Sequence, residues 1–511
     1  MRPKGVIAAG HPLSAEAAAQ ILEAGGNAFD AAIAAFFAAC VCEPVLASPA
    51  GGGFLLAACA DGSETLFDFF VQTPLAPAAG RELDFYPIRA DFGSARQEFH
   101  IGLGAVATPG CVHGLFDAHA RLCRLPMTRL VELAVALARG GVRVNALQAR
   151  VFEIVSPIYR ADEAVRGLFA GSAASGLVGE GDLLRLPQLA DSLEWLAEEG
   201  AGLFYSGEIG RRIVELCRHG GLLTAEDLHS YRSLRREPLR LDYRGHRLIT
   251  NPPPSSGGLL IAFALRLLED IDAGAVSEAD WLQQLARVMH LTGEARLDAE
   301  RRGLGLEAGS LLDTAFLDRY RSELQGRPGA RRGTTHVSVI DAAGNLAGLS
   351  VSNGEGCGRL IPDTGIMLNN MLGEQDLNPH GFHAWPPGQR MTSMMAPTLL
   401  DSPDGRRLVL GSGGSNRIRS AILQVLVNLV DLGLPLPEAI ERPRIHLEDE
   451  LLNVEAGLPE AAVARLFEHW PRHRLWPQRS LFFGGVHAAL LEADRLSGWG
   501  DPRRGGVVRL V

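Results

Sequence analysis

The chain has 511 residues, of which 47% are hydrophobic and 21% charged, a composition that excludes an intrinsically disordered protein. Its net charge of -10 and pI near 5.9 argue against nucleic-acid binding, which depends on clustered lysine and arginine. Lys4 is the single lysine, so the chain lacks the lysine of a phosphate-binding loop or of a Schiff-base enzyme.

The cysteines and the apolar runs indicate where the protein resides. The 7 cysteines are an odd number without CxxC spacing, which fits reduced thiols better than disulfides. The apolar run at 31–41 is too short to span a bilayer. We therefore expect a cytoplasmic protein that associates with no membrane and no nucleic acid.

The first half of the chain alternates helices and strands. A helix over 14–24, capped by Ser14 and ended by a Gly-Gly pair, is followed by a second helix from Ala28 to just before Pro44. The segments SPAGGGFLLAAC and ETLFDFFVQTP then predict strands. Apolar residues at helical spacing between 125 and 250 predict an outer layer of helices.

The last third of the chain has the pattern of a sheet. Before it, residues 322–333 (SELQGRPGARRG) lack apolar periodicity and predict a mobile surface loop. From Thr334 onward, short strands are predicted at THVSVID, NLAGLSVS, GIMLNNML, APTLLD and RRLVLGSGG. The apolar stretch IRSAILQVLVNLVDLG predicts one helix.

Thr334 has two interpretations. The sequence Thr-Thr-His is common at the start of a strand, because β-branched residues favour strands. Alternatively, cleavage of the Gly333–Thr334 bond would give Thr334 a free α-amine, which can take the proton of its own hydroxyl and make that hydroxyl a nucleophile. The dipeptide alone does not decide between them.

A series of ordered motifs favours the second interpretation. These motifs are ILEAGGNAFDAAIAA, AGGGF, NPPPSSGG, GTTHVSVIDAAGN, GIMLNNM, SMMAPT, GSGGSNRI and DPRRGG. The chain resembles, nearly end to end, the γ-glutamyltransferase family of N-terminal-nucleophile hydrolases. The resemblance implies an α/β protein with a four-layer αββα fold, made as a precursor that is cut into a large subunit, 1–333, and a small subunit, 334–511.

The same resemblance assigns roles in catalysis. Thr334 is the expected nucleophile, and Gly413 and Gly414 are expected to offer backbone N–H groups to the oxyanion. Ser352 takes the place of a second hydroxyl residue that orients the nucleophile. Cleavage is expected between Gly333 and Thr334.

Four further residues are expected to bind substrate. Asn370 and Glu374 match the region that binds a substrate α-amine, for which a carboxylate is a suitable counter-charge. Ser393 matches a contact to the substrate carboxylate, and Asn353, next to Ser352, is assigned to the same site.

The chain also departs from the family pattern. Phe70 stands where the family has an arginine that binds the α-carboxylate of the γ-glutamyl group, and Met394 replaces the second serine of a Ser-Ser pair. Arg359, Arg390 and Arg417 are candidates to replace the missing cation. The loop from 370 to 390 is also expected to be shorter than in relatives with a lid.

These departures leave the substrate open. The expected activity is hydrolysis or transfer of glutathione or another γ-glutamyl amide. The alternatives are the same chemistry on an oxamate-type amide or a dicarboxylic monoamide, and a non-catalytic relative that binds small amides. No metal or cofactor motif such as HExxH or GxGxxG is present, so none is expected. The expected assembly is a homodimer of precursors or a heterotetramer of subunits.

Overall fold

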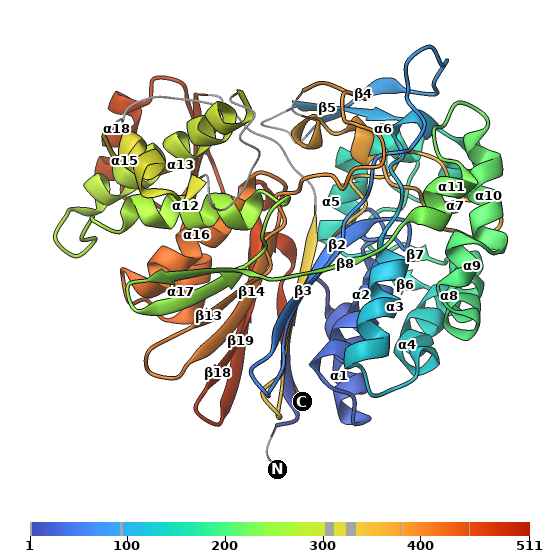
Figure 1. Ribbon diagram of the computed structural model, residues 1–511, viewed down its shortest axis with the longest axis horizontal. Coiled ribbons are helices and arrows are strands. Elements are labelled where there is room, and N and C mark those ends of the chain that lie inside the picture. The colour runs from blue at the N-terminus through green and yellow to red at the C-terminus, as the bar shows by residue number, and fades with distance from the viewer. Residues whose placement is uncertain (1–2, 92–95, 302–310, 323–333, 379, 449) are drawn as a thin grey trace.

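The structure is a computed structural model that describes residues 3–91, 96–301, 311–322, 334–378, 380–448 and 450–511. Two β-sheets pack face to face between two layers of helices (Figure 1). This four-layer αββα arrangement confirms the predicted fold class. The predicted mobile loop lies outside the described residues except for Ser322, and so does Gly333 of the predicted cleavage site.

The first sheet has seven strands, in the order β20-β1-β11-β12-β2-β3-β8. Their bounds in that order are Val507–Leu510, Gly5–Ala9, Thr335–Asp341, Leu346–Ser352, Gly52–Ala58, Glu64–Phe69 and Leu234–Arg236. Every residue of β11 and β12 is buried, because these central strands are covered on both faces.

The second sheet has six strands, in the order β19-β18-β14-β13-β10-β9. Their bounds are Arg495–Gly500, Gly485–Glu492, Arg407–Gly413, Thr398–Asp401, His246–Thr250 and Leu239–Tyr243. Smaller sheets comprise β15 (Ile445–Glu448), β16 (Leu451–Glu455) and β17 (His473–Trp476), β4 (Tyr86–Asp91) and β5 (Arg96–Ile101), and β6 (Val142–Arg143) and β7 (Leu183–Leu184). Both large sheets contain strands from before and after Thr334, although the division into subunits at that point stays a prediction.

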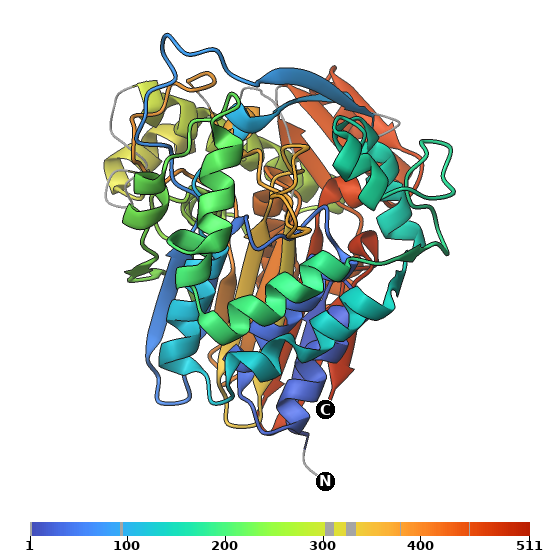
Figure 2. The ribbon, with the colours of Figure 1, turned by 90° about the vertical axis from the view of Figure 1, so that its right-hand side faces the viewer.

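One helical layer covers the outer face of the seven-stranded sheet, as Figure 2 shows from that side. The helices in this half of the molecule are α1 (Pro12–Glu23), α2 (Ala28–Cys42), α3 (Cys111–Leu122), α4 (Met127–Gly140), α5 (Ala146–Ile154), α6 (Ser156–Tyr159), α7 (Glu163–Leu168), α8 (Pro187–Glu199), α9 (Gly202–Tyr205), α10 (Glu208–Cys217) and α11 (Ala225–Ser230). Helix α2 is buried along its whole length, because it lies between the sheet and the outer helices.

The other helical layer covers the six-stranded sheet (Figure 1). It consists of α12 (Gly257–Leu268), α13 (Glu278–Arg301), α15 (Thr314–Ser322), α16 (Arg417–Val430), α17 (Leu436–Glu441) and α18 (Glu460–His469). Short 3₁₀ turns are η1 (Leu103–Ala105), η2 (Met371–Gly373), η3 (Gln375–Leu377), η4 (Leu481–Phe483) and η5 (Pro502–Arg504). None of the helices in the described ranges is long and apolar enough to cross a membrane.

Two local predictions were wrong. Ser14 does not cap the first helix, which begins at Pro12 with His11 as its cap; the His11 Nδ1 accepts from the backbone N–H of Leu13 at 3.1 Å. Proline is well suited to the first helical position, because its missing N–H would have no helical partner there. Ser14 is buried instead, and its hydroxyl donates to the Glu43 carboxylate at 3.4 Å.

The second error concerns GIMLNNML, which forms no strand. The Asn369 side chain takes the place of a strand partner: its amide donates to the carbonyls of Ala50 at 3.0 Å and Ala107 at 2.9 Å and accepts from the N–H of Ala107 at 3.1 Å. A side chain that satisfies neighbouring backbone groups in this way allows an irregular path. The chain then turns through η2 toward Glu374.

Candidate active site

Thr334 lies at the end of a central strand, between the two sheets. It directly precedes β11, whose Thr335 pairs with Val351 of β12, so Thr334 and Ser352 lie at the same end of neighbouring strands. Both are buried and line one pocket. The fold thus brings together the predicted nucleophile and the predicted second hydroxyl residue.

The loop after Ser352 supports the far side of this pocket. The Ser352 hydroxyl accepts from the backbone N–H of Gly354 at 3.0 Å. Gly354 has φ 64°, and a Cβ there would lie 2.1 Å from Asn370 Oδ1 and 2.4 Å from Glu374 Oε1. The segment 353–358 (NGEGCG) therefore needs a glycine at 354. Asn353 is fully buried outside the lining of the pocket.

The predicted oxyanion turn, Gly413-Gly414, lies against Thr334. Gly413 ends β14 and is so close to Thr334 that a Cβ would lie 1.9 Å from the Thr334 carbonyl oxygen. Gly414 follows with φ 125° and Ser415 with φ 51°, and helix α16 then begins at Arg417. Backbone N–H groups at such a helix start have no helical partners, so they are suited to bind an anion.

Arg504 joins Thr334 to this turn, a contact that the sequence did not predict. Its Nη1 donates to the Thr334 carbonyl at 3.3 Å, and its Nη2 donates to the Leu481 carbonyl at 3.4 Å. Its side chain also packs against Gly413 and Gly414. Arg504 belongs to the DPRRGG motif, so the motif was recognised but its role was not.

The rest of the pocket wall is mostly apolar. The remaining lining residues are Phe70, Met371, Glu374, Leu377, Ser393, Met394, Met395, Ser415 and Ile418. Phe70 is 1% exposed and stacks on Phe54 with 5.6 Å between ring centroids. Glu374 is the one ionisable side chain in this set, so the described lining contains a carboxyl group and no cation.

Glu374 has an unusual electrostatic environment. Burial, and then the nearby carboxylates of Glu355 and Asp376, hold the pKa of Glu374 well above its ordinary value. Its Oε1 has no hydrogen-bond partner. A cation that entered the pocket would favour the ionised form, so Glu374 is suited to bind a substrate amine or, when protonated, to donate a hydrogen bond.

Asn370 and Ser393 are largely engaged within the protein. Asn370 Oδ1 accepts from the backbone N–H of Glu355 at 2.8 Å. Ser393 Oγ accepts from the N–H of Met395 at 3.1 Å, and the Ser393 carbonyl accepts from the N–H of Ser256 at 2.9 Å. Ser393 lines the pocket and Asn370 does not, so their predicted contacts with substrate stay predictions.

None of the three candidate arginines lines the pocket. Arg359 pairs with Asp84 at 3.1 Å, and Arg390 pairs with Asp68 at 2.8 Å. Arg417 is 1% exposed, its guanidinium lies 4.9 Å from the Phe482 ring centroid, and its Nε and Nη2 have no hydrogen-bond partner. Burial lowers the pKa of Arg417 to about 9. Arg417 adjoins the pocket through Ile418 but does not replace the missing clamp at Phe70.

A second pair of residues beside the oxyanion turn was also missed. The Ser415 hydroxyl donates to Asp376 Oδ2, which ties the turn to the segment that carries Glu374. Burial raises the pKa of Asp376, and this hydrogen bond opposes the shift. In the sequence, the only sign of this contact is that an aspartate follows Glu374 by two residues.

Among the described residues, no group of three His, Cys, Asp or Glu side chains could hold a metal ion.

The four-layer αββα arrangement is the fold of the N-terminal-nucleophile hydrolases. Residues 14–511 match the Gamma-glutamyltranspeptidase family model, and the chain belongs to that family.

The relatives include two kinds of enzyme. The chain is 33% identical over 514 residues to the Acylase ACY 1 proenzyme of Pseudomonas sp. (strain V22), with 96% of this chain and 90% of that protein covered. It is 32% identical over 490 residues to the Glutathione hydrolase proenzyme of Escherichia coli (strain K12), with 89% and 83% covered. The cephalosporin acylase structure from Bacillus halodurans superposes with a TM-score of 0.84 at 25% identity, covering 99% and 96%.

Proposed function

We propose that this protein is a self-processing amidohydrolase that uses Thr334 to cleave amides whose acyl group has no α-carboxylate. The observation that carries this proposal is the wall of the nucleophile pocket, where Phe70 and three methionines stand with a single ionisable residue, Glu374. An α-carboxylate would be buried there without a cation. The names of the acylase relatives support this choice over glutathione.

Processing comes first in this mechanism. The Thr334 hydroxyl attacks the Gly333 carbonyl carbon, the peptide C–N bond breaks, and an ester forms between Gly333 and the Thr334 oxygen. Water then hydrolyses that ester, which frees the α-amine and restores the hydroxyl. Two relatives are named proenzymes, which supports such a step.

The mature site then acts on the amide. The freed α-amine takes the proton of the Thr334 hydroxyl as the oxygen attacks the substrate carbonyl, and the backbone N–H groups of the Gly413-Gly414 turn stabilise the oxyanion. The leaving amine takes that proton, and water releases the acyl group from Thr334. Arg504 holds the Thr334 carbonyl against this turn throughout.

Four matched anilides test the acyl specificity. The γ-glutamyl, glutaryl, 4-aminobutyryl and butyryl p-nitroanilides carry both the α-amine and the α-carboxylate, only the carboxylate, only the amine, and neither. We expect kcat/KM for the two without the carboxylate to exceed that for the γ-glutamyl compound more than tenfold, a difference of about 1.4 kcal/mol or more. Efficient hydrolysis of the γ-glutamyl anilide would overturn the proposal.

The second candidate is a γ-glutamyl hydrolase, and Glu374 favours it because a buried carboxyl group without a partner on Oε1 is suited to an α-amine. Glu374→Gln separates the contribution of the substrate amine from that of the rest of the acyl group. It should weaken the two amine-bearing anilides and leave the butyryl compound nearly unchanged. A high kcat/KM for the glutaryl anilide would instead support the dicarboxylic alternative. Arg417 is the nearest of the candidate arginines that could pair with the carboxylate of that substrate.

The cytoplasmic location and the assembly stay proposals. Cell fractionation followed by detection of the protein tests the location. Sedimentation gives the mass of the assembly, and denaturing electrophoresis of the same sample distinguishes a homodimer of uncut precursors from a heterotetramer of subunits, which have the same mass.

A further inference from the structure

The oxyanion turn consists of two glycines, so side chains of its own do not fix its position. Glycine adopts a wide range of backbone conformations, and Gly414 has φ 125°. On the strand side the turn is fixed, because Gly413 ends β14 and packs against the Thr334 carbonyl. On the helix side it continues into Ser415. The orientation of the planar Gly414–Ser415 peptide unit therefore depends on what holds Ser415.

Ser415 is held by a contact from outside the turn. It is buried, lines the nucleophile pocket and has φ 51°, a left-handed conformation that is costly for a residue with a side chain. A serine beside a helix start often accepts from the first-turn N–H groups, but the Ser415 hydroxyl donates to Asp376 Oδ2. Asn416, at the cap position, makes no capping hydrogen bond either. The contact with Asp376 thus holds Ser415 in its left-handed conformation and leaves the N–H groups of the helix start without a side-chain cap.

Asp376 lies on a segment that is itself held in place, the 3₁₀ turn η3. The Asn378 amide donates to the Glu374 carbonyl at 2.7 Å, and the Trp385 indole N–H donates to the Leu377 carbonyl at 2.8 Å. These side chains satisfy the backbone of a segment that has no strand partner. Asp376 can therefore act as a fixed point for the turn that it contacts.

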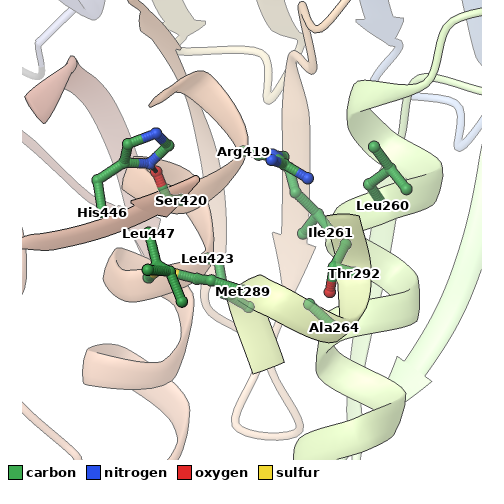
Figure 3. A pocket seen from close by; sticks show the side chains of 10 residues that line it. All are labelled: Leu260, Ile261, Ala264, Met289, Thr292, Arg419, Ser420, Leu423, His446 and Leu447. Atoms are coloured by element: carbon green, nitrogen blue, oxygen red, sulfur yellow. Dashed lines mark hydrogen bonds between the residues drawn. The ribbon is translucent and has the colours of Figure 1, made fainter. Parts of the chain in front are cut away.

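The far side of α16 is anchored by separate contacts. Ser420 Oγ lies 2.7 Å from His446 Nδ1 of β15, and Arg419 Nη2 donates to Glu448 Oε1 at 2.9 Å. Figure 3 shows Ser420 of α16 beside His446, on the side of the helix away from the turn. Because these contacts hold the helix, loss of the hydrogen bond at Ser415 is expected to move the turn and not the whole of α16.

We propose that Asp376 is a positioning residue for the reaction at Thr334, and that it holds the oxyanion turn in place through the Ser415 hydroxyl. This inference rests on the proposed use of Thr334 and adds a residue to it. Backbone donors of the turn act chiefly on the transition state, so loss of this hydrogen bond lowers kcat and leaves KM nearly unchanged. The loss is the same for every acyl group, unlike a loss of the amine contact at Glu374.

Two single variants and their combination test the proposal. Ser415→Gly removes the hydroxyl and suits the left-handed φ, and Asp376→Ala removes the acceptor. We expect each to lower kcat about 30-fold, because a misplacement of about 1 Å can cost roughly 100-fold. The double variant should also lose about 30-fold and not the product, since both changes break one hydrogen bond.

The substrate for these measurements is chosen so that the acyl preference does not enter. kcat is measured on whichever of the four anilides the unaltered protein cleaves fastest. A preference for the γ-glutamyl anilide would overturn the proposed acyl specificity, and the ratios of kcat on that anilide would still decide the role of Asp376. An active Thr334→Ala variant would instead overturn the proposed function itself.

Two further variants separate positioning from stability. Asp376→Asn keeps an acceptor oxygen for Ser415, so it should retain kcat for the butyryl anilide to within about threefold. Tyr243→Phe is the matched control, because the Tyr243 hydroxyl donates at 2.9 Å to Asp431, the residue that caps the other end of α16. This control should lower Tm, as Ser415→Gly does, and leave kcat unchanged.

Several results would overturn the positioning role. One is a kcat within about twofold of the unaltered protein in both Ser415→Gly and Asp376→Ala. Another is a pair of losses that multiply in the double variant, since the two residues would then act separately. A loss confined to the amine-bearing anilides would assign Asp376 to the environment of Glu374. An equal loss of kcat in Tyr243→Phe would attribute the effect to general destabilisation of α16.

Discussion

The two sides of the nucleophile pocket differ in how far they keep the family pattern. On the nucleophile side, Thr334 lies against Gly413 so closely that no side chain fits between them, and Arg504 fixes the Thr334 carbonyl. On the acyl side, Phe70 and Met394 contribute apolar surface to the pocket, at positions where the family pattern is expected to have an arginine and a serine. We therefore expect the chemistry of bond cleavage to follow the family and the recognition of the acyl group to differ from it.

The largest effect is expected at the nucleophile itself. Thr334→Ala should lower amide turnover by at least about 1,000-fold, because it removes the attacking oxygen, and it should also leave the precursor whole. Intact-mass analysis of the unaltered protein should show two pieces of about 36 and about 19 kDa, in proportion to the lengths on either side of the Gly333–Thr334 bond.

A conservative change provides the control for this result. Thr334→Ser keeps the hydroxyl and, after cleavage, the amine, so it should retain part of both processing and turnover. A chain that is cut elsewhere, or an active Thr334→Ala variant, would contradict the role of Thr334. In that case, loss of activity on thiol alkylation would indicate Cys357, which lies in the loop after Ser352, as the better candidate for the nucleophile.

The next largest effect is expected at Gly413. In Gly413→Ala the new Cβ would lie 1.9 Å from the Thr334 carbonyl oxygen and 3.2 Å from Arg504 Nη1, so the strand or the turn must shift. We expect processing and turnover to fall roughly 100-fold to 1,000-fold, the loss typical of a displaced oxyanion donor. Gly140→Ala on an exposed turn of α4, where nothing lies within 4 Å, is the matched control. Equal activity in both variants would show that the turn tolerates displacement.

A smaller effect is expected when the acyl side is restored to the family pattern. Phe70→Arg should raise kcat/KM for the γ-glutamyl anilide about tenfold relative to the butyryl anilide, because the new guanidinium offers a partner to the α-carboxylate. Phe70→Leu removes the aromatic ring without adding charge and controls for the lost stacking on Phe54. If Phe70→Arg and Phe70→Leu had the same ratio of kcat/KM for the γ-glutamyl and butyryl anilides, Phe70 would not set the acyl specificity.

Motifs of the sequence predicted the nucleophile side better than the acyl side. The order of the elements follows from patterns that are local in the chain, whereas the grouping of Thr334, Ser352 and Gly413 was expected from the resemblance to the family. The environment of Glu374 does not, because it depends on Glu355 and on Gly354, whose missing side chain makes room for it. The engagement of Arg390 with Asp68 likewise joins residues more than 300 positions apart, a pairing that no single segment reveals.

The smallest effect is expected at Glu43, and it concerns the stability of the fold. This carboxyl group lies at the end of α2, receives the Thr335 hydroxyl at 3.5 Å and is 2% exposed. Burial raises the pKa of Glu43 from 4.5 to about 7, and hydrogen bonds from Ser14 and Thr335 oppose the shift. The folded protein therefore holds this proton up to about pH 7, whereas the unfolded chain releases it near pH 4.5.

The sign of the stability effect follows from this difference. Because the folded state binds more protons between these two values, the Glu43 contribution to the free energy of unfolding falls as pH rises through that window and stays low above it. Glu43→Gln, which keeps the shape without the charge, should remove this fall and raise Tm by a few degrees at pH 8 relative to the unaltered protein, with little difference at pH 4.5. Thermal unfolding at both pH values measures it. An equal Tm difference at the two values would mean that Glu43 is ionised in the folded protein throughout and that the space behind the nucleophile strand is more polar than its burial indicates.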